Sequence, residues 1–409
     1  MVKRAAYQLV NDALDDTPVV LVVGPRQTGK STLTQEIARE RFAGNYVTLD
    51  DPVMLAEATE NPKGFLLSRK APVVLDEVQR APGLFLTMKL LVDKDRRSGQ
   101  YLLSGSANVL LMPKIADSLA GRMEPIDLFP FSQAELESSP HNFTDWLFGG
   151  DSASSLHCIG QDDLALRAVR GGYPEVVQRK GQDRRNAWFQ AYVRTLLDRD
   201  VRDLANISGL TQLPRLLSLM AARSGATLNL SGLSLDTGIP HTTLTRYVDL
   251  LKALMLVHYV PAWSASMDVR LAKAPKAYMV DTGLLCHLCG LDEEGVFRDW
   301  MRTGPVLKTL VANELTKLSK VGKVKPSIYH LRTVKQKEVD FVLEARNGSL
   351  VGVEVRNAPA ATTEDFEGLR FLDELAEGKF HRGVVLHTGS EAVAVSDKLF
   401  ALPISALWS

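Results

Sequence analysis

The sequence has few cysteines, no excess of either charge and no long apolar run. The three cysteines, Cys158, Cys286 and Cys289, are an odd and sparse set, which is typical of a protein of the reducing cytoplasm. Lysine plus arginine and aspartate plus glutamate number 48 each, so no overall field attracts the chain to nucleic acid or to an anionic membrane. No apolar stretch approaches the roughly 18 residues of a membrane span, and the polar, acidic stretch after Met1 does not predict a signal peptide. We therefore expect a cytoplasmic protein without a membrane partner, in which any nucleic-acid contact depends on a local basic patch.

The most informative stretch is an apolar run that leads into a glycine-rich loop and then into a helical pattern. The loop has the spacing G-x-x-x-x-G-K-[ST] of a P-loop. Glycines let the backbone turn tightly, so that its N–H groups point at phosphate oxygens at the start of a helix. We expect Lys30 to reach the β and γ phosphates of ATP and the Ser31 hydroxyl to bind Mg²⁺. The residues predicted to bind the nucleotide are Gly24, Pro25, Arg26, Gln27, Thr28, Gly29, Lys30, Ser31 and Thr32.

A second apolar strand, Val73–Leu75, ends in Asp76 and Glu77. An apolar strand that ends in Asp-Glu is typical of the Walker B element of a nucleotide site. We expect Asp76 to hold Mg²⁺ through water and Glu77 to polarise the attacking water. The alternative is an ordinary strand with a polar carboxyl end, which the position one strand after a P-loop disfavours.

Two further candidates follow along the chain. The strand Gln100–Ser106 ends in small polar residues, and open α/β sheets bind ligands at the carboxyl ends of their strands. Ser104 or Ser106 should therefore lie near the γ-phosphate, and we favour Ser106. Arg122 precedes a fifth strand, and it could reach a phosphate of its own subunit, reach one of a neighbour in a homo-oligomer, or be a solvated loop residue.

The middle of the chain contains a pattern of two helices around a glycine. A short helix ends at Gly238, and a second begins near Pro240, as in a helix-turn-helix. A DNA-reading helix would project Thr242, Thr243, Thr245 and Arg246 toward base edges. Basic residues are sparse here, and such modules also serve as packing units, so both interpretations stay open.

Several phrases together resemble a large prokaryotic family whose members join an AAA-type ATPase to a C-terminal domain of unknown function. The P-loop, Leu75–Pro82 and Leu103–Ser106 carry the resemblance early in the chain. Further phrases that match are Ser118–Arg122, Arg170–Glu175, Tyr278–Leu285 and Lys337–Val342, so the resemblance covers nearly the whole chain. It implies ATP hydrolysis with ATP and Mg²⁺ as cofactors.

The C-terminal part follows the order helix, strand, hairpin, helix and strand, which resembles the restriction-endonuclease-like, or PD-(D/E)XK, core. Nucleases with this core hold Mg²⁺ with an aspartate on one strand and a glutamate on the next, and place a lysine two residues further on. Asp340 and Glu354 match these positions, and Glu314 is a third candidate ligand. Arg356 stands where the pattern has lysine, and arginine is a poor general base because it keeps its proton. The alternatives are an active nuclease, a degenerate nuclease fold used for binding, and an edge strand with exposed charges.

We therefore predict an α/β protein with four segments. They are a P-loop, AAA-type ATPase sheet in residues 1–140, a linker and helical region in 141–225, a winged-helix or helix-turn-helix-like module in 226–290, and an α/β restriction-endonuclease-like domain in 291–409. The function we favour is ATP hydrolysis coupled to a C-terminal domain that binds nucleic acid or protein. The alternatives are an ATP-gated, Mg²⁺-dependent nuclease and a slow nucleotide switch that binds a protein partner.

Overall fold

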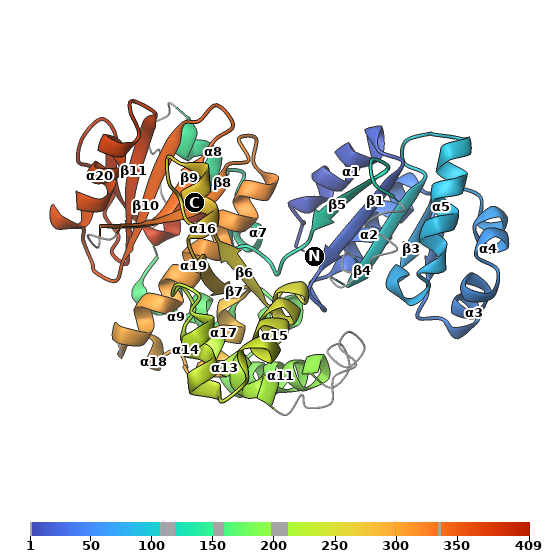
Figure 1. Cartoon of the computed structure of the whole chain (residues 1–409), viewed down its shortest axis with the longest axis horizontal. Helices are drawn as coiled ribbons and strands as arrows, with labels where there is room; N and C mark the ends of the chain where they lie inside the picture. The colour runs from blue at the N-terminus through green and yellow to red at the C-terminus, as the bar shows by residue number, and fades with distance from the viewer. Residues whose placement is uncertain are drawn as a thin grey trace. The chain divides into compact units, whose positions relative to one another are not determined.

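The computed structural model describes residues 2–106, 109, 119–149, 159–197, 212–298, 300–333 and 337–409. Ser118, Cys158 and Lys335 lie outside these described residues. The chain divides into two compact units, Met1–Pro130 with Lys252–Met255 and Phe131–Leu251 with Leu256–Ser409 (Figure 1). The predicted boundary at residue 140 therefore lies inside the second unit. Among the described helices, none is long and apolar enough to cross a membrane.

A parallel sheet forms the centre of the first unit. Its strands are Val19–Gly24 (β1), Tyr46–Thr48 (β2), Val73–Asp76 (β3), Tyr101–Ser106 (β4) and Met123–Asp127 (β5). They lie in the order β2-β3-β4-β1-β5, and all neighbours run parallel. The strand that leads into the P-loop is thus separated by β4 from the strand that carries Asp76.

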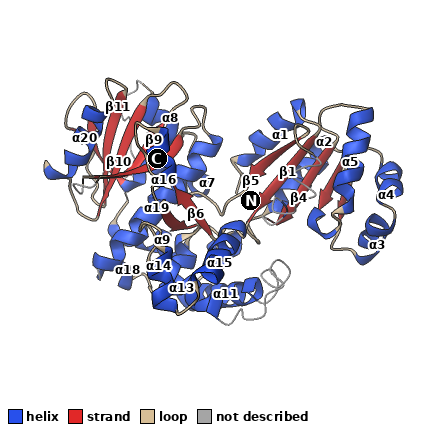
Figure 2. Ribbon diagram, viewed as in Figure 1, coloured by secondary structure: helices blue, strands red, loops and turns tan. Residues whose placement is uncertain are grey.

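Helices cover both faces of this sheet, because successive residues of a buried strand point to opposite sides (Figure 2). The helices of the first unit are Ala6–Asp16 (α1), Lys30–Arg41 (α2), Pro52–Glu60 (α3), Pro62–Arg69 (α4) and Gly83–Lys94 (α5). In β1, Val20 and Val22 belong to an apolar cluster with residues of α1 and α2. Val19, Leu21 and Val23 belong to a second cluster with residues of α3, α4 and α5.

The second unit begins with helices and a small antiparallel sheet. Its elements up to residue 298 are Gln133–Glu137 (α7), Phe143–Phe148 (α8), Gln161–Arg170 (α9), Pro174–Val177 (α10), Gln182–Thr195 (α11), Leu213–Ala222 (α13), Leu230–Thr237 (α14), His241–Ala253 (α15), Val257–Val260 (β6), Met267–Ala272 (α16), Lys276–Met279 (β7), Thr282–Cys289 (α17) and Gly295–Arg298 (α18). Gly238, with a φ of 73°, ends α14 before α15 begins. The two helices predicted around this glycine are therefore present. Thr227 forms an antiparallel bridge to Lys276, at the start of β7.

The segment 141–225, which the sequence predicts as a linker and helical region, contains the helix α8 near its start. The Asn142 side chain caps this helix by accepting two backbone N–H groups of its first turn. Trp146 stacks on Phe143 with 5.5 Å between the ring centroids, and the Arg382 guanidinium lies 4.3 Å from the Trp146 ring. A helix this short shows no apolar periodicity, and its packing partner Arg382 is distant in the sequence.

Two of the phrases that carry the family resemblance pack against each other around Asp281. Its carboxylate accepts the Gly172 N–H at 2.7 Å and the Leu284 N–H at 2.9 Å, which also caps α17. Burial raises the pKa of the Asp281 carboxyl. A Cβ at Gly283 would lie 2.7 Å from the Arg170 carbonyl oxygen, so the backbones meet closely. These phrases therefore build the scaffold of the second unit.

A mixed six-stranded sheet forms the C-terminal part of the second unit. Its elements are Trp300–Val321 (α19), Ser327–Arg332 (β8), Glu338–Glu344 (β9), Leu350–Arg356 (β10), Glu367–Leu375 (α20), Phe380–His387 (β11), Val393–Ala394 (β12) and Leu399–Pro403 (β13). The strand order is β12-β13-β11-β10-β9-β8. Neighbours among β8, β9 and β10 pair antiparallel, whereas β10 and β11 pair parallel across the α20 connection. Residues of α19 share an apolar cluster with one face of this sheet, and residues of α20 share one with the other.

Candidate functional site

The glycine-rich loop connects the end of β1 to the start of α2. Gly24 ends β1 where a Cβ would lie 2.2 Å from the carbonyl oxygen of Leu128, so a side chain does not fit there. Gly29 has a φ of 91°, in the left-handed region that favours glycine, and it precedes the first helical residue, Lys30. The loop therefore brings helix-start N–H groups and a lysine to the carboxyl edge of the sheet, which is the arrangement that binds phosphate.

Lys30 lies folded onto its own loop. Its side chain is buried, and its Nζ donates to the carbonyl oxygens of Gly24 at 3.1 Å and Pro25 at 2.8 Å. The Thr28 hydroxyl donates to the same Pro25 carbonyl at 3.0 Å. A charged phosphate oxygen is a stronger acceptor for an ammonium group than a neutral carbonyl, so bound phosphate would draw the amine from these oxygens. The other predicted loop residues are at least partly accessible to solvent: Arg26, Gln27 and Thr32.

Asp76 collects hydroxyl donors from three different elements. Ser31 Oγ donates to its Oδ1 at 3.2 Å, Tyr46 Oη donates to its Oδ2 at 2.7 Å, and the buried Ser104 hydroxyl also donates to Oδ1. Burial, and then the neighbouring Asp76 carboxylate, raise the pKa of Tyr46, so its hydroxyl keeps the proton that it donates. The sequence predicts Ser31 and Asp76 but not Tyr46, whose only signal is its place at the start of the strand beside β3.

Glu77 follows β3 in a left-handed conformation, with a φ of 56°. The Gln79 side-chain amide donates to the Glu77 carboxylate. The other end of this amide, Gln79 Oε1, is buried without a hydrogen-bond partner among the described residues. It lies so near β4 that a Cβ at Gly105 would come within 2.8 Å of it. The direction of the Glu77 carboxylate is therefore set by a neighbour that the sequence reasoning did not single out.

The end of β4 lies directly beside the P-loop. Ser106 pairs in register with Gly24, and Ser104 pairs with Val22 two residues earlier. Because β4 lies between β1 and β3, its carboxyl end is placed between the loop and Asp76. The structure thus puts Ser106 beside the glycine that opens the loop, while Ser104 contacts Asp76. Both candidates of the sequence analysis lie at the site, in different positions.

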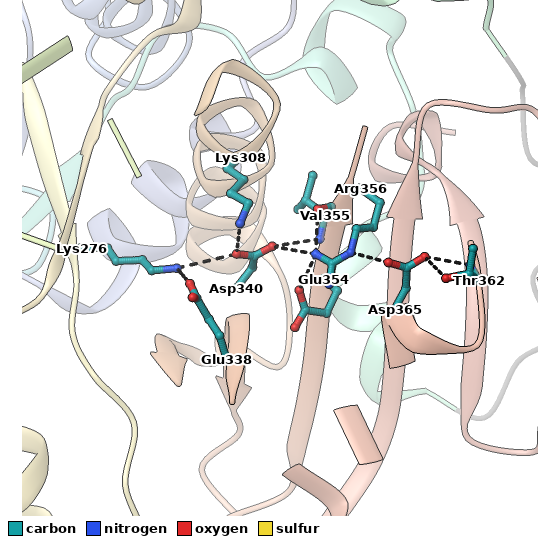
Figure 3. A network of polar contacts seen from close by, with 9 residues as sticks. All are labelled: Lys276, Lys308, Glu338, Asp340, Glu354, Val355, Arg356, Thr362 and Asp365. Atoms are coloured by element: carbon teal, nitrogen blue, oxygen red, sulfur yellow. Dashed lines mark hydrogen bonds and ion pairs between the residues drawn. The ribbon is translucent and has the colours of Figure 1, made fainter. Parts of the chain in front are cut away.

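A second charge cluster lies in the C-terminal sheet (Figure 3). Asp340 of β9 is 1% exposed. The Lys308 ammonium, from α19, lies 2.5 Å from its Oδ1, and the Lys276 ammonium, from β7, lies 3.6 Å from the same oxygen. The Val355 N–H donates to Oδ2 at 3.1 Å. Burial alone would raise the pKa of Asp340, but the two ammonium groups lower it. The Lys276 amine also pairs with Glu338 at 2.5 Å.

Glu354 and Arg356, on β10, extend this cluster. Arg356 Nη1 donates to Glu354 Oε2 at 3.0 Å, and Arg356 Nε donates to Asp365 Oδ1 at 2.6 Å. Burial, and then the charge of Asp340, raise the pKa of Glu354 well above its usual range. The two predicted carboxylates are thus adjacent, but the acceptor oxygens of Asp340 are engaged by N–H donors. The arrangement is an ion-pair network and does not fit a metal site.

Glu314 does not join these two carboxylates. It accepts the Gln133 backbone N–H at 2.8 Å and pairs with Lys317 at 3.3 Å. Burial raises its pKa, an effect that Lys317 offsets in part. No group of three or more histidine, cysteine, aspartate or glutamate side chains suited to a metal occurs in the described part of the chain. Glu314 is therefore engaged by Gln133 and Lys317, and its role as a third metal ligand beside Asp340 and Glu354 stays a prediction.

Comparison with known families agrees with the geometry at the P-loop. Residues 16–137 match a family model described as "AAA domain". Most of the matched segment lies in the first unit, which is thus similar to an AAA domain. Residues 161–295 and 303–407 match two further models, each described as a domain of unknown function, DUF8612 and DUF4143.

Two mycobacterial relatives match nearly the whole chain. They are "Uncharacterized protein Rv2008c" of Mycobacterium tuberculosis and "Uncharacterized protein Mb2031c" of Mycobacterium bovis, each 27% identical over 402 residues. The match covers 98% of this chain and 83% of each relative. The similarity to these relatives thus extends over all three matched segments.

Solved structures that share similarity include AMPPCP-bound DnaA from Aquifex aeolicus and a RuvB variant from Thermotoga maritima. Their sequences are 16% and 17% identical to this one. The matches cover 62% and 63% of this chain and 89% of each solved chain. Their TM-scores are 0.27 and 0.28, which are too low to support an argument about this chain.

Arg122 lies at the amino end of the sheet in the AAA domain, opposite the P-loop. Its carbonyl accepts the N–H of Val19, the first residue of β1, whereas the loop begins at Gly24, the last. Five residue steps of about 3.3 Å place these ends about 16 Å apart. The guanidinium pairs with Asp93 at 2.5 Å. Arg122 therefore does not face the loop of its own subunit, and contact with a neighbour's phosphate stays a prediction.

The helix α15 presents part of the face predicted to read DNA. Thr242 and Arg246 are exposed. The Thr245 hydroxyl donates to the His241 carbonyl of its own helix at 2.9 Å and is therefore engaged. DNA contact by this helix stays a prediction.

Proposed function

We propose that the AAA domain binds ATP with Mg²⁺ and hydrolyses it, and that nucleotide state is coupled to the second unit. The observation that carries this proposal is the 3.2 Å contact between Ser31 and Asp76, which joins the P-loop to the carboxylate of β3. A hydroxyl and a carboxylate at this distance are oxygen ligands of the kind that Mg²⁺ prefers. Lys30 brings a positive charge to the same edge for the phosphates.

In this proposal each residue of the site has its own role in ATP binding or hydrolysis. The loop N–H groups and Lys30 bind and orient the phosphates, and Asp76, held by three hydroxyls, keeps its carboxylate at the site. Bound Mg²⁺ neutralises charge on the phosphate oxygens. Glu77 accepts the proton of the attacking water, and Gln79 sets the direction of its carboxylate. Ser106 is the candidate contact for the γ-phosphate because it lies beside Gly24.

The direct test measures ATP binding by calorimetry and phosphate release by a coupled assay, with and without Mg²⁺. We expect ATP binding and Mg²⁺-dependent phosphate release by the purified full chain. Folded protein that neither binds ATP nor releases phosphate would overturn the proposal.

For the C-terminal domain we propose a restriction-endonuclease-like core that binds nucleic acid without cutting it. The order α19, β8, β9, β10, α20, β11 and the adjacent positions of Asp340 and Glu354 support the likeness. The ion-pair network supports the absence of cleavage. Lys308 and Lys276 form ion pairs with Asp340. Arg356 forms an ion pair with Glu354, and arginine is a poor general base.

Gel-shift and nicking assays on plasmid and single-stranded substrates, with Mg²⁺ or Mn²⁺ and with or without ATP, test this second proposal. We expect weak binding that falls with salt and is reduced when Lys335 and Lys337 are changed to glutamate, and negligible nicking. The expected affinity is modest because Lys337 already pairs with Glu367 at 3.0 Å. Cleavage that is lost in Asp340→Ala would establish a nuclease instead, and absence of any nucleic-acid binding would favour the switch that binds a protein partner.

A further inference from the structure

Arg4 is a buried cation beside the P-loop. It lies two residues before α1 and is 9% exposed. Its Nη1 donates to the Thr28 carbonyl at 2.6 Å, and its Nη2 donates to the Phe129 carbonyl at 2.7 Å. Arg4 precedes the residues that match the AAA domain, and no motif of the sequence includes it.

The bond to Thr28 fixes the direction of one peptide group in the loop. In a planar trans peptide the C=O and the following N–H point in opposite directions. A Thr28 carbonyl that faces Arg4 therefore turns the Gly29 N–H to the other side. Gly29 precedes the first residue of α2, where N–H groups have no partner within the helix and are free to bind anions.

The guanidinium also lies close enough to act through its charge. A Cβ at Gly29 would be 3.7 Å from Arg4 Nη1, so the positive group lies directly beside the Thr28–Gly29 peptide. The second bond joins the same side chain to Phe129, in the segment that follows β5. One cation thus holds the loop against the backbone at the neighbouring strand end.

We propose that Arg4 is a positioning residue for phosphate binding: it holds the Thr28 carbonyl so that the Gly29 N–H points toward the nucleotide phosphates. The inference rests on the proposed ATP binding. The inference adds that a residue outside the loop, Arg4, fixes the direction of a peptide group in the loop. The packing of α1 does not depend on this side chain, because Val10, Ala13 and Leu14 anchor that helix in the apolar cluster.

The test compares Arg4→Ala and Arg4→Lys with Lys3→Ala, an exposed neighbouring cation that serves as the matched control. We expect the dissociation constants of ATP and ADP to rise about tenfold in Arg4→Ala, as for the loss of a hydrogen bond to a charged group. Arg4→Lys, which keeps the charge but not the two-pronged donor, should show a smaller rise. KM should rise with the dissociation constants, while kcat at saturating ATP stays within about threefold, because Arg4 does not touch the reacting atoms. Lys3→Ala should bind as the wild type does.

A second readout separates positioning from general stability. In glycine-labelled protein, ADP should shift the Gly29 amide resonance of the wild type, and the shift should be reduced in the Arg4 variants. Folded Arg4→Ala that binds both nucleotides with wild-type affinity would overturn the inference. If Arg4→Ala does not fold, the affinity of Arg4→Lys is the test. Wild-type affinity of Arg4→Lys for both nucleotides would then overturn the inference. Failure of the wild type itself to bind ATP would instead overturn the proposed function.

Discussion

The hydroxyl of Ser31 donates to the carboxylate of Asp76 at 3.2 Å, across 45 residues of sequence. The contact exists because both residues lie at the carboxyl edge of one parallel sheet, Ser31 at the start of α2 and Asp76 at the end of β3. Tyr46 and Ser104 donate to the same carboxylate from β2 and β4. Three other elements thus hold the acidic side chain in place.

Replacement of Lys30 should abolish ATP binding. Lys30 is the lysine of the P-loop motif, and its bonds to Gly24 and Pro25 keep its ammonium group at the loop. We expect no measurable ATP affinity in Lys30→Ala by calorimetry, whereas Lys63→Ala, at an exposed position of the same unit, should bind normally. Undiminished affinity in Lys30→Ala would contradict the assignment of the loop.

Replacement of Glu77 by glutamine should separate binding from hydrolysis. The substitution keeps the shape of the side chain but removes the base, which costs on the order of a hundredfold in rate. We expect unchanged ATP affinity and about a hundredfold slower phosphate release, with Glu60→Gln at an exposed position as the control. Equal turnover would move the base elsewhere, with Asp76 as the next candidate.

Hydrolysis should depend on protein concentration if Arg122 acts on a neighbour. An arginine supplied by another subunit contributes a factor of about 10³ or more to phosphoryl transfer. Arg122→Ala and Lys30→Ala should each be nearly inactive, and their mixture should recover part of the activity. Because Arg122 lies at the opposite end of β1 from its own loop, absence of recovery would remove it from the mechanism altogether.

Loss of Lys308 should destabilise the second unit. Its ammonium lies 2.5 Å from the buried Asp340 carboxylate, and removal of one partner of a buried ion pair costs about 3 kcal/mol or more. Chemical denaturation should show this loss in Lys308→Ala and not in Lys323→Ala, at an exposed position. The double variant Lys308→Ala with Asp340→Asn should recover part of the stability, since the unpaired charge is gone. Equal stability of Lys308→Ala and wild type would show that Lys276 alone suffices.

Acidification should weaken the second unit through His330. Burial, and then the positive charge of Lys276, lower the pKa of His330 from the usual 6.5 to about 4. Between these values the unfolded chain binds a proton that the folded state does not, so the free energy of unfolding falls as pH decreases from 6.5 toward 4. The loss is at most about 3 kcal/mol. The pH dependence of denaturation should flatten in His330→Asn, relative to wild type and to His141→Asn. An unchanged slope would mean that the ring is not protonated on unfolding in this range.

The sequence by itself determined the elements whose signals are contiguous. The P-loop, the Asp76–Glu77 pair and the glycine between α14 and α15 are local patterns, because phosphate binding and helix termination require particular residues at fixed spacing. The hairpin that carries Asp340 and Glu354 follows from two apolar runs that Asn347 and Gly348, typical turn residues, separate. Each of these elements could be predicted without knowing which residues contact it in the folded chain.

Only the tertiary structure decided which end of the sheet a residue faces and which neighbours it meets. Strand order brought Tyr46 and Ser104 to Asp76 and left Arg122 at the far edge, and chain folding placed Arg4 behind the loop. The Glu314 side chain accepts the backbone N–H of Gln133. The residue of α19 that contacts Asp340 is Lys308. Sequence spacing carries no information on such contacts, because they depend on the register and packing of elements that are far apart in the chain.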